Sequence, residues 1–462
     1  MFRSMWCAMA FAVAALPAQA QESDTAKMRE ELRQLQQRLQ QLERRLQETE
    51  AKSGKAEEAA QRAESTATQA AAQASSRPQT ESALNPAVSV ILNGVYGNFS
   101  RDPNTYRLNG FVPSMGDLAP GRRGLSLGES ELAFMSNIDH MFRGTLIASI
   151  SPDNSSIDVE EGYIQTIGLS NGFTIKAGRF FSAVGYQNQV HAHAWDFTDT
   201  PLAMKVFLGN QLNEDGIQFK WVAPTDLYFD VGVELGRGRQ FPSGVDRNKN
   251  GFGSTNFFTH LGGDLGPSIA WQTGLSHLWT SPKDRAYADV DSAGADVVNS
   301  FTGKSRLWVL DGVLKWAPNG NPTYNNFKLQ GEYFQRKENG DLTFDTATRA
   351  LTDGLISRQS GWYLQGVYQF LPQWRVGYRY DRLDSGTTKI GLVDSGALRA
   401  ADFPILGGYN PKRNTVMVDW NPSEFSRIRL QFARDYSRLG QPDNQLLLQY
   451  IVSLGAHGAH RF

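Results

Sequence analysis

The sequence predicts an all-β transmembrane barrel of about 16 antiparallel strands, preceded by an α-helical coiled-coil segment. Three patterns predict this fold. Apolar and polar residues alternate through most of residues 88–462, the apolar rows carry aromatic residues at their ends, and leucines recur every three or four residues before them. Alternation is typical of strands with one face away from water, and aromatic girdles mark both edges of the apolar band on membrane barrels.

Composition narrows the class of protein. After the N-terminal segment no run of about 18 apolar residues occurs, so no helix is predicted to span a bilayer. Lys and Arg total 46 against 47 Asp and Glu, and this balance predicts no nucleic-acid partner. The single cysteine, Cys7, excludes a disulfide within the chain and a cysteine-based zinc site. No cofactor motif is present, and none is predicted.

Residues 1–20 predict a signal peptide. Arg3 precedes an apolar run from Met5 to Leu16, and the run ends in the small-x-small sequence Ala18-Gln19-Ala20. The apolar run is too short to span a bilayer. We therefore expect export from the cytoplasm, and the barrel pattern places the mature chain in the outer membrane of a Gram-negative bacterium.

Residues 21–75 are predicted to form a periplasmic helical stalk, and residues 76–87 are predicted to form a linker. The stalk is predicted by leucines spaced three and four residues apart, at Leu32, Leu35, Leu39, Leu42 and Leu46. This heptad spacing is typical of helices that coil around one another. A single amphipathic helix lying on a surface is the alternative.

Residues 88–462 predict the barrel domain. The clearest apolar rows, taken at every second residue, are Leu227–Leu235, Trp308–Trp316, Trp362–Phe370, Trp374–Tyr380 and Ile428–Phe432. An aromatic residue followed by proline marks the ends of four strands, at Trp221…Pro224, Trp316…Pro318, Phe370…Pro372 and Trp420…Pro422. Each of these sites predicts a short turn.

Longer polar segments separate the remaining strand ends. They are predicted as loops at 100–123, 151–156, 182–213, 236–255, 280–305, 336–360, 382–412 and 437–444. Long loops that alternate with short turns give sixteen strands, and an even number puts both chain ends on the periplasmic side. The last strand alternates toward the terminal residue Phe462, which resembles the signal that the outer-membrane assembly machinery recognises.

The polar face of the predicted strands carries charges of both signs. Acidic residues are Glu129, Glu131, Asp158, Glu160, Asp230 and Glu234, and basic residues are Lys328, Arg375, Arg379, Arg427 and Arg429. A barrel of about sixteen strands is wide enough for an aqueous channel, and rings of charge set ion preference in pores. We therefore expect these side chains to line a channel for passive diffusion of small polar or ionic solutes.

The segment 182–213 is unusually apolar for a loop in water, with Trp195, Phe197, Phe207 and Leu208. Such a loop needs a surface to bury against, and the inside of the barrel wall offers one. We expect the loop to fold inward and narrow the channel. Its only lysine or arginine is Lys205.

His191 and His193 occur in the same loop. They are half of a metal site if Asp196 or Asp199 joins them, but histidines at i and i+2 bind zinc poorly alone and no third histidine is near. The sequence favours a hydrogen-bonding role, and no metal is predicted.

Four short motifs resemble the phosphate-selective porin O/P family of Gram-negative outer membranes. They are Leu127-Gly128-Glu129-Ser130-Glu131-Leu132, Val159-Glu160-Glu161-Gly162-Tyr163-Ile164, Lys176-Ala177-Gly178-Arg179-Phe180 and Trp195-Asp196-Phe197. The resemblance covers roughly residues 88–462. It implies a trimeric sixteen-strand porin in contact with outer-membrane lipid and lipopolysaccharide, with an inward third loop. Phosphate-selective members carry lysine and arginine clusters at the constriction, whereas this loop carries Lys205 alone.

Other classes of protein fit the sequence less well. An enzyme needs a nucleophile with its base, and no such spacing is found, so no catalytic residue is predicted. A TonB-dependent receptor needs a plug domain and about 22 strands. A trimeric autotransporter adhesin contributes few strands per chain. The main alternative is a structural tether, in which the stalk reaches peptidoglycan and the pore is incidental.

Overall fold

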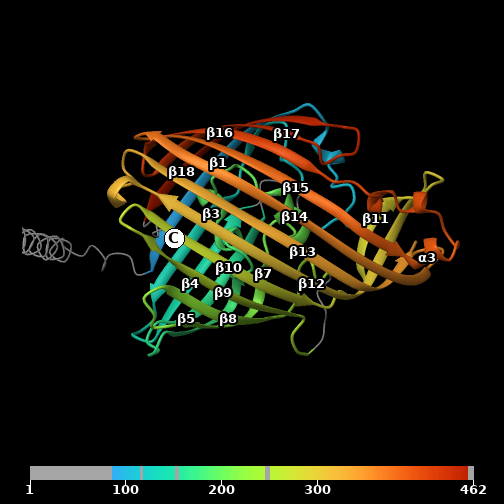
Figure 1. Ribbon diagram of the computed structural model, residues 1–462, viewed down its shortest axis with the longest axis horizontal. Helices are drawn as coiled ribbons and strands as arrows, with labels where there is room; N and C mark the ends of the chain where they lie inside the picture. The colour runs from blue at the N-terminus through green and yellow to red at the C-terminus, as the bar shows by residue number, and fades with distance from the viewer. Residues whose placement is uncertain (1–85, 115–117, 151–155, 245–249, 456–462) are drawn as a thin grey trace, which may run out of the picture. The chain divides into compact units, whose positions relative to one another are not determined.

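The computed structural model describes residues 86–114, 118–150, 156–244 and 250–455. The predicted signal peptide, the stalk, nearly all of the linker and Phe462 lie outside the described residues. The described chain from Ala87 onward forms a barrel of antiparallel strands (Figure 1). Within the described residues no helix is long and apolar enough to cross a bilayer.

Eighteen strands make up the sheet. They are β1 (Ala87–Phe99), β2 (Gly124–Leu127), β3 (Ser130–Asn137), β4 (Phe142–Ile150), β5 (Ile157–Thr166), β6 (Phe173–Phe181), β7 (Asn213–Val222), β8 (Tyr228–Gly236), β9 (Ser254–Leu265), β10 (Ile269–Thr280), β11 (Arg285–Val290), β12 (Asp296–Trp316), β13 (Asn326–Phe344), β14 (Leu351–Leu371), β15 (Trp374–Ile390), β16 (Lys412–Ser423), β17 (Ser426–Asp435) and β18 (Asp443–Gly455).

Helical segments lie in the connections. Among the described residues the α-helices are α2 (Leu202–Leu208) and α3 (Gly391–Asp394), and the 3-10 turns are η2 (Pro103–Thr105), η3 (Gln187–Gln189), η4 (Ala192–Ala194), η5 (Pro318–Gly320), η6 (Ala400–Asp402) and η7 (Pro404–Leu406).

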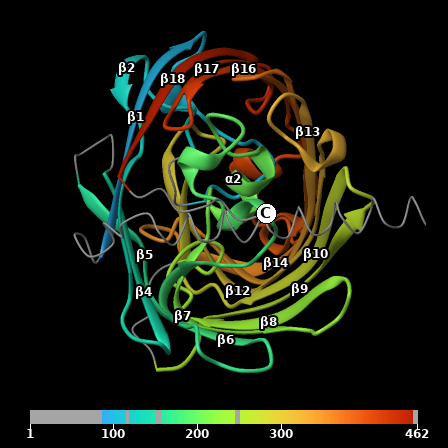
Figure 2. The same cartoon turned by 90° about the vertical axis from the view of Figure 1, so that its left-hand side faces the viewer.

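The sheet closes on itself because the first strand pairs with the last. The β1–β18 register runs from Ser89 opposite Gly455 to Phe99 opposite Gln445. The eighteen strands occupy sixteen positions, since β2 and β3 both pair with β1, and β10 and β11 both pair with β12. The predicted sixteen-strand closed barrel is thus confirmed, and Figure 2 shows the ring end on.

Alternation sorts side chains between the two faces of the wall. On β14, Tyr363 is 1% exposed and points inward, whereas its neighbours Trp362 and Leu364 are 38% and 47% exposed on the outer face. The outer face is apolar over much of its area, with aromatic pairs such as Trp374 and Trp420, whose rings stack at 6.1 Å across β15 and β16. The alternating rows in the sequence therefore predict the faces correctly.

A row of three exposed basic residues borders the apolar outer face where β12, β13 and β14 extend beyond it. Arg306 of β12 pairs with Lys337 of β13, and Lys337 pairs with Arg358 of β14. All three are exposed, and each has the same parity as the outer aromatic residues of its strand. Further along the same strands most outward positions are polar, although Val298 and Ile356 are apolar and exposed.

Four neighbouring strands are much longer than predicted. Strands β12, β13, β14 and β15 contain 21, 19, 21 and 17 residues, whereas β4, β6 and β8 contain 9 each. The predicted loops 280–305 and 336–360 are therefore wrong in large part, because much of each is strand, whereas 382–412 is wrong only in its first part, where β15 continues to Ile390. Polar alternation continues through these segments without a breaker, and the link between β13 and β14 shrinks to residues 345–350.

The inside of the barrel is partly filled by its own loops. One apolar cluster joins α2 and Phe111 to inward residues of β10 and β12–β15, including Leu307 and Phe334. A second cluster in the long-strand region joins Phe403 and Ile405 to inward residues such as Phe301. The inner wall thus serves as the packing surface of the loops.

Paired cysteines test the closure between β1 and β18. Tyr96 and Leu448 lie opposite each other and both face outward. Cα atoms of antiparallel partners are about 4.5–5.5 Å apart, within the range that a disulfide bridges. In a C7S background, the Y96C/L448C variant should form a disulfide in the folded protein and migrate as a cross-linked species after denaturation. The Y96C/L364C control should not, because β14 pairs with β13 and β15; cross-linking of both, or of neither, contradicts the closed register.

Candidate functional site

The connection between β6 and β7, residues 182–212, is anchored to the inner wall of the barrel at several points. In Figure 2 its helix α2 lies within the ring of strands. The apolar residues that predicted an inward loop are buried, with Trp195 7%, Phe197 1% and Phe207 0% exposed. We call residues 182–212 the inner loop.

Helix α2 attaches the inner loop to the long-strand side of the wall. The sequence LAMKVFL follows Pro201 and ends at Gly209, whose φ of 68° suits a glycine cap. Phe207 stacks on Phe334 of β13 at 5.8 Å and meets Phe111 edge to face at 6.0 Å. The Leu202 amide, at the helix start, donates to Asp381 Oδ1 at 2.8 Å. Apolar packing and one capped amide therefore fix the helix.

An acidic wall contacts the two histidines of the inner loop. His193 Nδ1 lies 2.8 Å from Glu131 Oε1 on β3, and His191 Nε2 lies 3.0 Å from Glu161 Oε2 on β5. His191 Nδ1 is also 3.4 Å from both Glu131 Oε2 and Glu160 Oε2. Burial acts to lower the pKa of His191, but the surrounding carboxylates outweigh burial and hold the pKa well above its ordinary value.

A β-bulge brings two adjacent glutamates to this wall. Ala148 of β4 pairs with Val159 and Ile147 pairs with Glu161, so Glu160 is the extra residue between them. Simple alternation predicts Glu160 inside and Glu161 outside, whereas Glu161 is 8% exposed and both contact His191. The sequence therefore missed Glu161. Two adjacent glutamates before Gly162 are the signal that indicates a bulge.

A basic wall contacts the two aspartates of the same loop. Asp196 accepts from Lys328 of β13 at 2.9 Å and lies 3.4 Å from Arg375 of β15. Burial alone would raise the pKa of Asp196, but these two positive charges outweigh burial and hold the pKa below its usual range. The predicted residues Lys328 and Arg375 are thus brought together with Asp196.

Asp199 binds the basic wall at a second point. Its carboxylate lies 2.9 Å from Arg379 of β15 and 2.5 Å from Arg413 of β16. Burial acts to raise the pKa of Asp199, and the charges of Arg413 and Arg379 more than reverse this effect. These depressed pKa values mean that both aspartates stay ionised, and both sets of contacts persist, until the pH falls well below 3.8, the ordinary value for aspartate.

The other predicted arginines hold the turn that leads into Asp196. Arg429 donates to the Trp195 carbonyl at 3.0 Å and forms a two-pronged pair with Asp419 at 2.7 and 2.9 Å. Arg427 donates to the carbonyl oxygens of His193 at 2.8 Å and Trp195 at 3.4 Å. Arg413, Asp381 and Asp419 were not among the predicted site residues, because alternation indicates only that a position faces inward and not which residues it contacts.

Two predicted residues lie apart from these contacts, and one sits at their edge. Lys205 of α2 is 3% exposed, donates to the Leu118 carbonyl at 2.9 Å and lies over the Tyr106 ring, and its positive charge also acts on Asp199. Asp158 is exposed and accepts from Ser156. Glu129, between β2 and β3, is half-buried beside Glu131 and Glu160.

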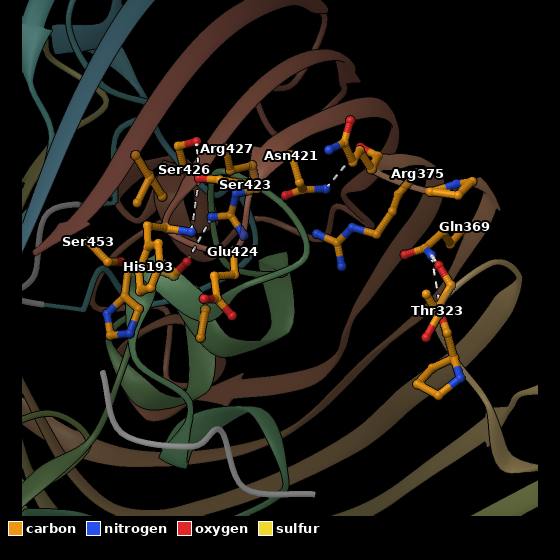
Figure 3. A pocket seen from close by; sticks show the side chains of 16 residues that line it. His193, Thr323, Gln369, Arg375, Asn421, Ser423, Glu424, Ser426, Arg427 and Ser453 are labelled. Carbon is orange, nitrogen blue, oxygen red and sulfur yellow. Dashed lines mark hydrogen bonds between the residues drawn. The ribbon is translucent and has the colours of Figure 1, made fainter. Parts of the chain in front are cut away.

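A cavity of about 590 Å³ opens beside the inner loop, near the short turns. Figure 3 shows that Arg375 and Arg427 extend toward it from the wall, with His193 on the loop side. Amide and hydroxyl groups of Gln369, Asn421 and Ser426 complete much of the lining, together with Glu424. The lining therefore combines polar groups, two guanidinium groups among them, with apolar residues such as Phe425 and Ile451.

Comparisons with known proteins give a barrel likeness without a family assignment. No family model matches the chain. The chain is 29% identical over 417 residues to an uncharacterized protein of Aquifex aeolicus (strain VF5). The alignment covers 83% of this chain and 81% of that protein.

Three solved structures illustrate the likeness of fold. A loop-deletion mutant of OmpT, an outer membrane protein of Vibrio cholerae, matches with a TM-score of 0.48 at 10% identity, over 79% of this chain and 98% of its own. An anion-selective porin from Comamonas acidovorans matches with a TM-score of 0.47 at 11% sequence identity, over 79% of this chain and 98% of its own. The outer membrane channel DcaP of Acinetobacter baumannii matches with a TM-score of 0.46 at 12% sequence identity, over 79% of this chain and 96% of its own. Likenesses this distant carry no functional argument.

Removing the charge of Asp199 tests the anchor on the basic wall. The D199N variant leaves Arg379 and Arg413, each 1% exposed, without the shared carboxylate. Loss of one partner from a buried ion pair costs about 3–5 kcal/mol, so we expect the free energy of unfolding to fall by about 3 kcal/mol. Guanidinium titration in detergent micelles measures it.

The matched control is D215N, which removes the partner of the partly exposed Arg179. Exposed pairs contribute about 0–1 kcal/mol, so this variant should stay close to the parent. Equal effects of D199N and D215N would contradict the anchoring role of Asp199.

Proposed function

We propose that the chain forms an outer-membrane channel through which small polar or ionic solutes diffuse passively. The observation that carries the proposal is the closed barrel of sixteen strand positions with an apolar outer face and charged, polar inner walls. A barrel of this size has room for an aqueous bore, and backbone closure is what a lipid environment requires of a sheet.

The outer face supports a membrane position. The apolar outer row of β14 spans the ~9–11 residues that a tilted strand needs to cross a bilayer. The basic row Arg306–Lys337–Arg358 lies where this row ends, and it suits the phosphate groups of lipopolysaccharide. The short turns lie at the same end of the barrel as the start of β1 and the end of β18, and we assign this end to the periplasm.

We propose the inner loop as the constriction of the channel. Its histidines contact the acidic wall and its aspartates contact the basic wall, so it spans part of the bore. Most of the charged residues that the sequence analysis predicted to line the channel then anchor this loop instead, including Glu131, Glu160 and Arg379. The passage follows the remaining polar surface.

A weak preference for anions follows from the cavity lining. Arg379 and Arg429 are 1% and 0% exposed and each pairs with aspartates. Arg375 and Arg427 line the cavity, and Arg427 donates to backbone carbonyls rather than to a carboxylate. Arg375 pairs with Asp196 and Asp419, and Glu424 also lines the cavity, so the proposed positive excess is small and rests mainly on Arg427.

The remaining parts of the proposal concern assembly. We propose that the chain self-associates as a homotrimer, that residues 21–75 form its periplasmic coiled coil, and that Phe462 serves as the assembly signal. The heptad leucines and the C-terminal alternation support these proposals. The same leucines support the rival proposal of a tether that reaches peptidoglycan.

Planar-bilayer recording tests the channel. The purified chain should give discrete conductance steps, with a reversal potential in a KCl gradient that indicates weak anion preference. A correctly folded barrel that does not conduct overturns the channel and favours the tether.

Replacing the two cavity arginines tests the source of selectivity. A unit charge about 10 Å from an ion contributes about 0.4 kcal/mol in water, and salt at about 0.1 M screens much of this. The R375A/R427A variant should therefore shift the permeability ratio about twofold toward cations. The control R358A removes an outward arginine and should leave the ratio unchanged. An unchanged ratio in R375A/R427A places these residues outside the ion path.

A further inference from the structure

We propose that Glu131, Glu160 and His191 form a binding site for a divalent transition metal, with Zn²⁺ as the best-fitting ion, and that the ion fastens the inner loop to the acidic wall. The three side chains come from β3, β5 and the inner loop, and one ligand atom from each lies within 4.8 Å of the others. We call this group the Glu-Glu-His cluster.

The spacing within the cluster suits tetrahedral coordination. His191 Nδ1 lies 3.4 Å from Glu131 Oε2 and 3.4 Å from Glu160 Oε2. Zinc binds imidazole nitrogen and carboxylate oxygen at about 2.0–2.2 Å, which in a tetrahedron places neighbouring ligand atoms about 3.3–3.6 Å apart. The two distances are thus those of zinc ligands, whereas direct hydrogen bonds would be shorter.

Two atoms of the cluster lack hydrogen-bond partners. His191 Nδ1 and Glu160 Oε2 are both shielded from solvent, and neither has a hydrogen-bond partner among the described residues. The side chains of Glu131, Glu160 and His191 are 3%, 12% and 17% exposed. A buried polar atom without a partner costs free energy, and one cation between these atoms would satisfy both.

The neighbours of the cluster orient its ligands toward one point. Because a carboxylate only accepts, the contact of 3.0 Å between His191 Nε2 and Glu161 Oε2 places a proton on Nε2, so Nδ1 is the nitrogen that faces the cluster, and a metal ion would displace any proton from it. Glu161 is itself held by the Phe181 amide at 3.1 Å. This carboxylate–histidine arrangement is the usual outer support of a metal-bound histidine.

His193 supports the second ligand in the same way. Its Nδ1 lies 2.8 Å from Glu131 Oε1, which leaves Glu131 Oε2 for the cluster. The His193 ring stacks on the His191 ring, with centroids 5.9 Å apart and planes at 21°. Both ligand groups are therefore positioned before an ion binds.

The charge around the cluster favours a cation. Four carboxylates gather there, those of Glu129, Glu131, Glu160 and Glu161, and the positive charge of Lys176 acts on Glu161. Three of these carboxylates, those of Glu131, Glu160 and Glu161, contact the two histidines and concentrate negative charge at the cluster. A divalent ion would neutralise this excess, and a mixed nitrogen and oxygen ligand set with a fourth position for water fits Zn²⁺.

Zinc titration of the full chain tests the proposal. Untagged protein in detergent, stripped with EDTA, should bind about one Zn²⁺ per chain, measured by isothermal titration and elemental analysis. X-ray absorption should show nitrogen and oxygen ligands with one imidazole. Absence of a stoichiometric site on the folded parent chain overturns the proposal without reference to any variant, and conductance plays no part in this measurement.

Variants locate the ion. H191Q and E160Q should each weaken binding more than tenfold, and E161Q should weaken it about 10–100-fold through loss of the supporting contact. The control H260Q removes another buried histidine–carboxylate contact, that of His260 with Asp230, and should bind zinc like the parent. Circular dichroism and protease resistance confirm that each variant is folded. Equal zinc binding by folded H191Q and the parent would overturn the assignment.

Discussion

The pairing of β1 with β18 is the constraint on which the rest of the molecule depends. Each unpaired edge of a sheet presents a row of open backbone donors and acceptors, and closure removes both edges at once. Eleven residue pairs join the two strands, so the first and last strands of the domain meet along most of their length. Closure also creates an inside, and every charged contact of the inner loop exists because the wall surrounds it.

The inner loop shows how such an interior is organised. A loop inside a barrel meets wall on every side, so opposite charges at different points along it can each find a partner. His191 and His193 contact glutamates of β3 and β5, while Asp196 and Asp199 contact basic residues of β13, β15 and β16. The distribution of charge along the loop thus fixes its direction across the barrel, and α2 adds apolar packing.

Much of the fold could be predicted from sequence because alternation with period two records which face meets lipid-like surroundings and which does not. The rows at 308–316 and 362–370 have the predicted faces. The predicted loops at 280–305 and 336–360 were wrong because polar alternation looks alike in a strand and in a loop. Partners such as Arg413 depend on contacts more than 200 residues apart, and Glu161 depends on a bulge that shifts the register by one residue. Neither leaves a periodic trace in the sequence.

The unequal lengths of the strands give the barrel an oblique rim. At about 3.3 Å per residue, a strand of 21 residues reaches some 40 Å further than one of 9, measured along the strand. The tall side, formed by β12–β15, carries α3 and the segment 391–411 against its inner surface (Figure 1). In the proposed channel, a solute would reach this opening past a wall that stands higher on one side than on the other.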